Sequence, residues 1–581
     1  MNDREHGVNT GAALDGATVE VIRHYLNSTA EQMRRTLVRT AFNPVIYEVL
    51  DFGISMYDRD RRLISESSGI LFFLGANDYA IHKGVEKVGV ENLHPGDVVI
   101  LNYPYWSGAH AADAMMFAPV FSEGSDLPDA YLAVRAHWMD LGAKDPGYVL
   151  DSTSMHQEGL ILPAVKLVRK GEVDSQMMDI LRYNSRLPVN ITGDFHAQIA
   201  ALRVGERRLH QIWEKFGLAT VDRAINQIIS HGAETASEAV RAMPDGKWSA
   251  FDWLDDDGIS HDLIRMAVTV TIDDERFTVD FADSDGAVPG PVNMPFGCTL
   301  SLAKNVFKSL TTPDTPANHG HYQPLEVVCP PGNLFHAVYP SATYTLWTGM
   351  AGFELINKAL AKGMDGIHAS SGSDLPGFMA VGTHPHTGEM YLVSNNEGLG
   401  WGATPSHDGA NALQHPSTTS VRNTSIEVLE HQSPLFHERL ELRRDSGGAG
   451  RWRGGLGVSR QVKFLAPGEV LSMKKKTKTK PWGLRGGHEP ETNAMVVWPG
   501  TDRERRARME RFSMNAGESF HNLSAGGGGW GDPLDRPIES VRDDVLDEYV
   551  SAEQADRVFG VRVEADGTPT PTMARLDRPA P

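Results

Sequence analysis

The sequence predicts a large mixed α/β protein of the α+β type, built from several layers, with a strand-rich region that carries the candidate catalytic residues. Short apolar runs typical of strands mark residues 96–175, while helical spacing of apolar residues marks residues 17–42 and 193–217. The chain has 581 residues, which is too long for one simple hydrophobic core. It also contains 57 glycines and 33 prolines, which indicates many turns and a loop-rich fold.

The N-terminal part begins with two helices and a hairpin between them. Apolar residues recur at helical spacing through residues 17–42, and a further helix is expected over residues 73–90. Between these helices, apolar residues alternate from Phe52 to Met56 and are followed by a charged turn at residues 58–61. The pattern predicts a β-hairpin at this point.

A strand-rich stretch and two long helices follow. Residues 96–175 contain several short apolar runs separated by turn residues. Residues 193–217 have an apolar side typical of an amphipathic helix, and Gly217 is the expected C-cap. A second helix is expected directly afterwards, over residues 219–242.

From Trp248 onward the pattern changes to strands, glycine turns and short helices. The expected elements are strands within 265–285, a helix within 292–312, a Gly-, Asn- and Ser-rich segment over 366–425, strands with glycine turns over 440–530, and two short helices with a final strand within 537–563.

These changes in pattern predict three parts of the chain. The first part, 1–245, is an α/β region that contains the candidate site. The second, 246–440, is a central α/β region, and the third, 441–581, is a glycine-rich strand region that ends in helices.

The composition excludes several classes of protein. The formal net charge is −20, which argues against nucleic acid as a partner because phosphate binding requires a basic surface. Cys298 and Cys329 are the only cysteines, so no disulfide framework is expected, in keeping with a reducing cytoplasm. The polar N-terminus has no signal-peptide pattern, and no apolar stretch has the length of a membrane span. We therefore expect a cytoplasmic protein that contacts neither nucleic acid nor a membrane.

A repeated spacing of histidine and aspartate is the clearest sign of chemistry in the sequence. His110 and Asp113 are three residues apart, and so are His137 and Asp140. Imidazole and carboxylate groups are ligands for zinc, manganese or iron, and such sites can leave a coordination position open for catalysis. One such pair is often only a surface helix contact or a cap, so the hypothesis of a metal site depends on the repetition.

Each pair follows an apolar run that is typical of a strand. The runs lie near residues 98–102 and at residues 131–136. If the two runs belong to one sheet, the two pairs can face one small volume.

Two glycine-rich blocks look superficially like phosphate-binding loops. They are GGAGRWRGGLG at 447–457 and SAGGGGWGDP at 524–533. Neither has the Gly-Lys-Ser/Thr ending that a P-loop requires. We expect tight turns and close backbone approach in both blocks, and no cofactor-binding residues in this chain.

One basic run, KKKTKTK at residues 474–480, stands out in the acidic chain. The expected role is a solvated loop, and contact with a phosphate or a partner protein is the alternative.

With these motifs in order, the chain resembles the hydantoinase B family. That family includes the B subunits of ATP-dependent N-methylhydantoinases, the matching half of 5-oxoprolinase, the caprolactamase B subunit, and the large subunits of acetone and acetophenone carboxylases. The resemblance extends over nearly the whole chain. Its blocks include residues 48–64, 96–121, 135–147, 396–412, 422–435 and 523–537.

The resemblance implies the fold of that family and a heteromeric enzyme. Family members work with an A-type subunit that carries the ATP site, with its Mg²⁺, and ATP phosphorylates an oxygen of the substrate or of bicarbonate. The B-type subunit then completes ring opening or carboxylation. The resemblance assigns catalytic roles to Asp51, His110, Asp113 and His137, with Asp51 as the group that orients or deprotonates water. Asp51 also has a simpler interpretation, a structural carboxylate at a strand turn.

The same resemblance implies a divalent metal, manganese, zinc or iron, on His110, Asp113 and His137. Asp140 is the fourth candidate ligand. Its alternative role is to fix the tautomer of a neighbouring histidine that binds the metal.

Three hypotheses for the function remain open at this point. The first is a hydrolase subunit for a cyclic amide, the second is a ketone carboxylase subunit that uses bicarbonate, and the third is a scaffold subunit with a decayed site. The intact His/Asp residues argue against the scaffold. Many relatives have aspartate at the position of Tyr103 and threonine at that of Ala109, which puts the substrate in doubt. Because the acetone carboxylase large subunit is considerably longer than this chain, the cyclic-amide hydrolase is favoured.

Overall fold

The computed structural model describes residues 13–373 and 376–576. Its first layer is a seven-stranded sheet with the order β2-β1-β5-β4-β3-β6-β7, and every strand pair in it is antiparallel. The strands are β1 (Phe52–Asp58), β2 (Leu63–Glu66), β3 (Val98–Leu101), β4 (Asp113–Val120), β5 (Ala130–His137), β6 (Val165–Arg169) and β7 (Glu172–Val173). β1 and β2 form the predicted hairpin.

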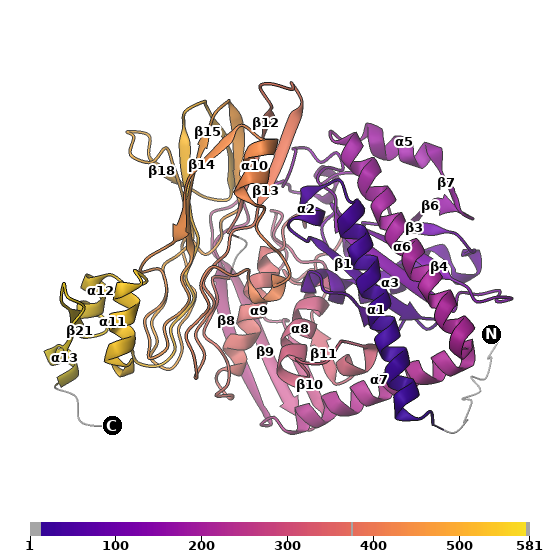
Figure 1. Ribbon diagram of the computed structural model, residues 1–581, viewed down its shortest axis with the longest axis horizontal. Helices are drawn as coiled ribbons and strands as arrows, with labels where there is room; N and C mark the ends of the chain where they lie inside the picture. Colours follow the sequence, from indigo (N-terminus) through magenta and orange to yellow (C-terminus); the bar gives the residue numbers. More distant parts are fainter. Residues whose placement is uncertain (1–12, 374–375, 577–581) are drawn as a thin grey trace.

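Helices cover both faces of this sheet, which explains why β1, β4 and β5 are buried along their whole length. On β4, Met116 faces the cluster formed by α1 and α6, whereas Phe117 faces α3. Figure 1 shows this layer on the right-hand side of the molecule. The helices of this part are α1 (Gly16–Thr40), α2 (Pro44–Tyr47), α3 (Leu71–Val88), α4 (Pro104–Ser107), α5 (Ser175–Tyr183), α6 (Pro188–Phe216) and α7 (Leu218–Arg241).

The four helices predicted in this part are present. α6 begins earlier than expected, at Pro188, where proline is well suited to the first turn because its missing N–H has no partner there. Gly217 ends the helix with a φ of 77°, as predicted for the C-cap.

The central layer is a four-stranded sheet with the order β11-β10-β9-β8, packed against two helices. The strands are β8 (Gly246–Leu254), β9 (Ile264–Asp273), β10 (Arg276–Asp280) and β11 (Leu325–Val328), and the helices are α8 (Phe296–Thr311) and α9 (Trp347–Leu360). The sequence predicted α8 but not α9. Thirteen of the fourteen residues of α9 are buried, so its sequence lacks the polar face that makes a helix recognisable.

Two further sheets form the C-terminal layer, at the upper left of Figure 1. Their orders are β13-β12-β16-β19 and β14-β15-β20-β17-β18, and they share the core around Phe378, Val462 and Phe520. The strands are β12 (Phe378–Thr383), β13 (Met390–Asn395), β14 (Leu435–Leu442), β15 (Val458–Phe464), β16 (Gly468–Ser472), β17 (Ala494–Val497), β18 (Arg505–Ala507), β19 (Glu510–Met514) and β20 (Ser519–Leu523).

The chain ends in a small helical unit, as the sequence predicts. Its elements are α11 (Ile538–Leu546), α12 (Ala552–Arg557), β21 (Val561–Val563), β22 (Pro569–Pro571) and α13 (Met573–Leu576). A further short helix, α10 (Ile426–Gln432), packs near β13 and β14.

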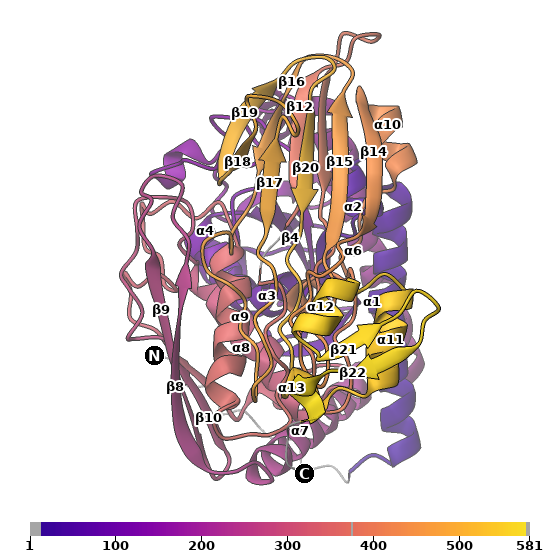
Figure 2. The same ribbon diagram turned by 90° about the vertical axis from the view of Figure 1, so that its left-hand side faces the viewer.

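The glycine-rich blocks form a layer of extended segments beneath the C-terminal sheets (Figures 1 and 2). The backbone N–H of Gly400 donates to Ala525, and that of Gly455 donates to Trp401. A Cβ atom added at Gly527 would lie 1.8 Å from the carbonyl oxygen of Trp401. Close backbone approach, as predicted for both blocks, is therefore the reason for the glycines.

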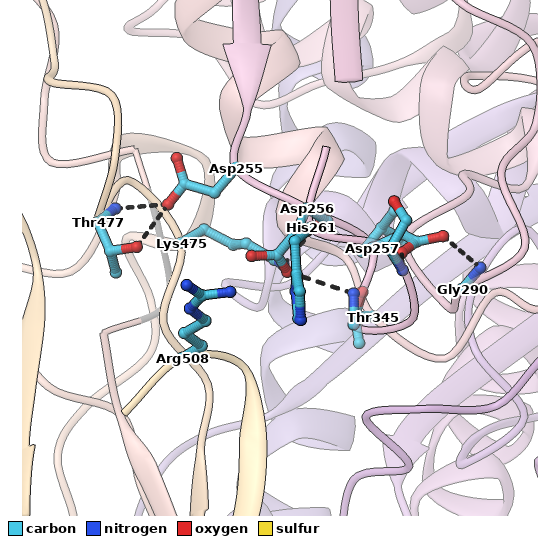
Figure 3. Close-up of polar contacts among 12 residues, drawn as sticks. Asp255, Asp256, Asp257, His261, Gly290, Thr345, Lys475, Thr477 and Arg508 are labelled. Carbon is cyan, nitrogen blue, oxygen red and sulfur yellow. Dashed lines mark hydrogen bonds and ion pairs between the residues drawn. The ribbon is translucent and has the colours of Figure 1, made fainter. Parts of the chain in front are cut away.

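The prediction of a solvated loop was wrong for the first half of the basic run 474–480, whereas Lys478 and Lys480 in its second half are exposed. Lys474, Lys475 and Lys476 are at most 2% exposed. Lys475 Nζ lies 2.7 Å from a carboxylate oxygen of Asp256, in a turn of three aspartates that follows β8 (Figure 3). Asp256 compensates the charge of Lys475 and Asp252 that of Lys476, and nothing in the local sequence of the lysine run indicates these partners.

The proposed division at residues 245 and 440 stays a prediction. The first two sheets lie on either side of residue 245, whereas β12 and β13 pair within one sheet with strands beyond residue 440. Among the described residues, no helix is long and apolar enough to cross a membrane. Residues 1–12, for which we predicted no signal peptide, lie outside the described residues.

Candidate metal and catalytic site

Three neighbouring strands bring Asp51, Asp113 and His137 together. β1, β5 and β4 are adjacent in the seven-stranded sheet. Asp113 is the first residue of β4 and lies opposite His137, the last residue of β5. Asp51 directly precedes β1, and its carbonyl accepts a hydrogen bond from the backbone N–H of His137 (3.2 Å). The three residues therefore lie at the same end of the sheet.

His110 lies on the turn that connects α4 to β4. Gly108 in this turn has a φ of 71°, and a Cβ atom there would come within 2.8 Å of Gly297 Cα, so the position requires glycine. Asn102 braces the turn, because its side-chain amide donates to the carbonyl of Ala111 (2.7 Å). The two apolar runs that precede the His/Asp pairs belong to one sheet, as expected, but β4 lies between them.

The imidazole and carboxylate groups form one compact, buried cluster. His137 Nδ1 is 3.0 Å from one carboxylate oxygen of Asp113, and His110 Nδ1 is 3.2 Å from the other. One ligand atom from each of these three side chains lies within 4.8 Å of the others. None of the three residues is more than 4% exposed.

Several polar atoms at this cluster have no hydrogen-bond partner. They are Oδ1 of Asp51, Nδ1 of His110 and Oδ2 of Asp113. Buried polar atoms almost always form hydrogen bonds, yet Asp51 Oδ1 has no partner, and His110 Nδ1 and Asp113 Oδ2 approach each other at 3.2 Å without hydrogen-bond geometry, so the arrangement requires an explanation. Nitrogen and oxygen donors of these types bind zinc, manganese or iron. The His110, Asp113 and His137 side chains thus fit a divalent metal ion.

Burial and neighbouring charges shift the pKa values of the cluster in different directions. Burial lowers the pKa of His110 to about 4, so the ring is neutral at neutral pH and offers a lone pair. Burial alone would lower the pKa of His137, but the hydrogen bond with Asp113 and the negative charge of Asp51 raise it. Burial raises the pKa of Asp51 to about 7; the charge of His137 opposes this shift and that of Asp113 adds to it.

Asp140 lies apart from the three clustered side chains. One of its carboxylate oxygens is 2.6 Å from a guanidinium nitrogen of Arg186, a residue of the loop that precedes α6. A second guanidinium nitrogen of Arg186 donates to the carbonyl of Ala143 (2.7 Å). The Asp140 carboxylate thus ties the segment that follows His137 to the loop before α6, and its role as a fourth ligand stays a prediction.

We expect Asp140→Asn to lower kcat by about 10-fold, which is far less than the decrease expected when a metal ligand is replaced. The amide oxygen can still accept a hydrogen bond from Arg186, so the segment after His137 keeps its place. Steady-state kinetics of the assembled enzyme, with metal content measured in parallel, tests this. A loss of bound metal as complete as that in His110→Ala would instead identify Asp140 as a ligand.

Aromatic side chains that the sequence did not single out surround His110. The ring of Tyr344 stacks on the imidazole with 5.3 Å between centroids, and Tyr148 approaches edge-on at 5.6 Å. Tyr148 also stacks on Trp347, the first residue of α9. These aromatic residues come from two distant segments of the chain and carry no recognisable spacing in the sequence.

A cavity opens from Asp51 and His110 between α3, α9 and the segments around residues 396 and 420. Its lining residues are Asp51, Ile70, Phe72, Phe73, His110, Tyr148, Leu346, Trp347, Met350, Asn396, Thr418 and Val421. Asn396 is the first residue of the block 396–412, which carries part of the family resemblance. This block is the feature of the sequence that could have indicated this wall of the cavity.

Comparisons with known proteins agree with this architecture. The hydantoinase B/oxoprolinase family model matches residues 15–533. The chain is 30% identical over 580 residues to a putative B-type subunit of a D-/L-hydantoinase from Pseudomonas sp. (strain NS671), with 95% of each chain covered. The crystal structure of the ATP-dependent caprolactamase from Pseudomonas jessenii matches with a TM-score of 0.87 and 25% identity, over 96% of this chain and 98% of that chain.

The nucleotide-free structure of acetone carboxylase has the same fold, with a TM-score of 0.85 and 18% identity, over 97% of this chain and 84% of that chain. The hydantoinase relative is named as one subunit of its enzyme, which implies a partner subunit in a hetero-oligomer. The caprolactamase is an ATP-dependent enzyme, and acetone carboxylation is ATP-dependent as well. Because the family model matches most of the chain, the chain belongs to the hydantoinase B/oxoprolinase family.

Proposed function

We propose that this chain is the catalytic B-type subunit of an ATP-dependent cyclic-amide hydrolase, which opens a hydantoin, an oxoproline-like ring or a lactam. The observation that supports this most is the buried cluster of His110, Asp113 and His137, which adjoins Asp51 at the end of a cavity. The likeness to an ATP-dependent caprolactamase over almost the whole of both chains supports the same reaction class.

The chemistry of ring opening explains why these residues are needed. An amide carbonyl is stabilised by resonance, and phosphorylation of its oxygen makes the carbon electrophilic and provides a leaving group. A divalent metal on His110, Asp113 and His137 would supply Lewis-acid polarisation and lower the pKa of a water molecule. Asp51 would orient that water and accept its proton, since the residue lines the cavity and one of its carboxylate oxygens has no hydrogen-bond partner.

The ATP site, with Mg²⁺, is assigned to an A-type partner subunit. This chain has no P-loop ending, and its glycine-rich blocks pack against other backbone segments, as at Gly454, where an added Cβ would lie 1.8 Å from the carbonyl of Gly527. A cytoplasmic hetero-oligomer, with access to ATP, fits an arrangement in which the partner binds ATP and this chain carries the hydrolytic site.

The test is substrate-dependent ATP hydrolysis by the chain purified together with its A-type partner. The panel contains hydantoins, lactams and ketones, each with and without bicarbonate. We expect turnover of a cyclic amide that does not need bicarbonate, with the ring-opened acid as product.

The second candidate is a ketone carboxylase subunit, which the fold shared with acetone carboxylase favours. Turnover of a ketone only when bicarbonate is present would establish this reaction and refute the hydrolase. Both reactions would use the same residues, His110, Asp113, His137 and Asp51, so identification of the product separates them.

A further inference from the structure

Beyond the cluster of polar residues, the walls of the cavity are almost entirely apolar. The apolar lining residues are Ile70, Phe72, Phe73, Leu346, Trp347, Met350 and Val421. They come from α3, α9 and the segment before α10, and they are continuous with Asp51 and His110. A substrate whose reacting amide lies at Asp51 and His110 therefore places the rest of its ring against apolar side chains.

Asn396 and Thr418 are the polar residues of this apolar part. The Thr418 hydroxyl already donates to the carbonyl of His415 (3.1 Å). The side-chain amide of Asn396 makes no hydrogen bond within the described part of the chain, although only 7% of the residue is exposed. A carboxamide on the cavity wall that makes no hydrogen bond to described protein atoms offers both donor and acceptor atoms, which match the C=O and N–H of a cyclic amide.

The neighbours of Asn396 hold its backbone in place. Gln414 donates to the carbonyl of Asn396 (2.8 Å). The next residue, Glu397, forms a buried ion pair with Arg460, with nitrogen-oxygen distances of 2.5 and 3.2 Å. Asn423 donates to a carboxylate oxygen of Glu397 (2.8 Å). Such bracing is expected for a residue that has to present its side chain to a ligand in one orientation.

Away from the proposed metal site, the cavity wall offers no basic side chain to a substrate, because none of its lining residues within the described part is lysine or arginine. Two cations lie behind the wall, Arg135 at 5.6 Å from the Phe73 ring centroid and Lys475 at 5.8 Å from that of Trp347. Arg135 is engaged with neutral oxygen atoms and Lys475 with Asp256, and neither residue lines the cavity.

We propose that this cavity selects cyclic amides whose ring and substituents are uncharged, and that Asn396 is the specificity residue that hydrogen-bonds the polar edge of the ring. The inference rests on the proposed function and narrows it, because it places carboxylated rings outside the substrate range. A carboxylate on the part of the ring away from the reacting amide would be buried against apolar side chains, with no lysine or arginine on that part of the wall to pair with it, because the proposed metal on His110, Asp113 and His137 lies at the reacting amide.

A matched pair of substrates tests this on the assembled wild-type enzyme. 2-Pyrrolidinone and 5-oxoproline have the same ring and differ only in a carboxylate. We expect kcat/KM for 2-pyrrolidinone to exceed that for 5-oxoproline by about 100-fold or more. A hydantoin with an isopropyl group at carbon 5, compared with hydantoin-5-acetic acid, should show the same order.

The results distinguish a failure of the proposed selectivity from a failure of the proposed function. Equal or better turnover of the carboxylated rings would overturn the selectivity while leaving the cyclic-amide hydrolase in place. Absence of turnover for every ring, together with bicarbonate-dependent turnover of a ketone, would refute the proposed function itself.

Two variants test the residues involved. Asn396→Leu should lower kcat/KM for neutral rings by about 10- to 100-fold without changing the metal content, because one buried hydrogen bond to the substrate is lost. Val421→Lys introduces a cation into the wall and should shift the preference toward 5-oxoproline. Leu465→Lys, at a residue that is 58% exposed and does not line the cavity, is the matched control and should leave the preference unchanged. An unchanged kcat/KM in Asn396→Leu would remove that residue from the proposal.

Discussion

Replacing His110 or Asp113 with alanine is expected to lower turnover by the assembled enzyme by at least about 1000-fold. Each side chain offers a ligand atom within 4.8 Å of the other two of the cluster, so each replacement leaves two donors in place of three. Asp113 has the additional role of accepting the hydrogen bond of His137, so its loss also releases that ring.

The measurement combines substrate-dependent ATP hydrolysis with elemental analysis of the purified complex. Both variants should still assemble with the partner, because His110 and Asp113 are at most 1% exposed and do not contribute to the surface. His196→Ala is the control, since that histidine is exposed on α6, away from the cluster. Near-wild-type activity in either His110→Ala or Asp113→Ala would show that the cluster is not the active centre.

Glu397→Ala is expected to destabilise the chain by about 3–5 kcal/mol, the largest loss of stability that we predict for a single replacement. Glu397 and Arg460 are 0% and 1% exposed. Removing the carboxylate leaves the guanidinium buried without its counter-charge, and one of its nitrogens already lacks a hydrogen-bond partner. The cost of burying an unpaired charge is the reason for the size of the effect.

Urea unfolding followed by tryptophan fluorescence measures this loss. Asp365→Ala is the matched control, because its ion pair with Arg485 lies at the surface, where the two side chains are 96% and 47% exposed. That control should change stability by less than about 1 kcal/mol. The double replacement Glu397→Leu with Arg460→Met should recover much of the lost stability, because no charge stays buried. A loss in Glu397→Ala no larger than in the control would contradict the argument.

The local sequence was enough to predict the elements that have one buried face and one exposed face, because their apolar residues recur with the period of the helix or strand. α1, α6 and α7 were predictable because each has one apolar and one polar face, and Gly217 marks the end of α6. The β1–β2 hairpin followed from alternation and a charged turn. α9 could not be found in the same way, since it is buried on all sides.

The sequence also determined which side chains could carry the chemistry, but the sheet decided which of them meet. His110 with Asp113 and His137 with Asp140 have the same spacing, yet only Asp113 joins both histidines. The register of β4 against β5 places Asp113 opposite His137, whereas Asp140 follows the end of β5 in a loop and pairs with Arg186.

The tertiary structure also determined which charged residues pair when they lie far apart in the sequence. A run of lysines is normally solvated, and Lys475 is buried because Asp256, more than two hundred residues earlier, compensates its charge. Most of the cavity wall could not be predicted either, since Phe73 and Trp347 come from distant segments, although Asn396 opens a block that carries the family resemblance. The periodicity of the sequence indicates only which face of an element is buried, whereas strand register and packing between layers determine which residues that face contacts.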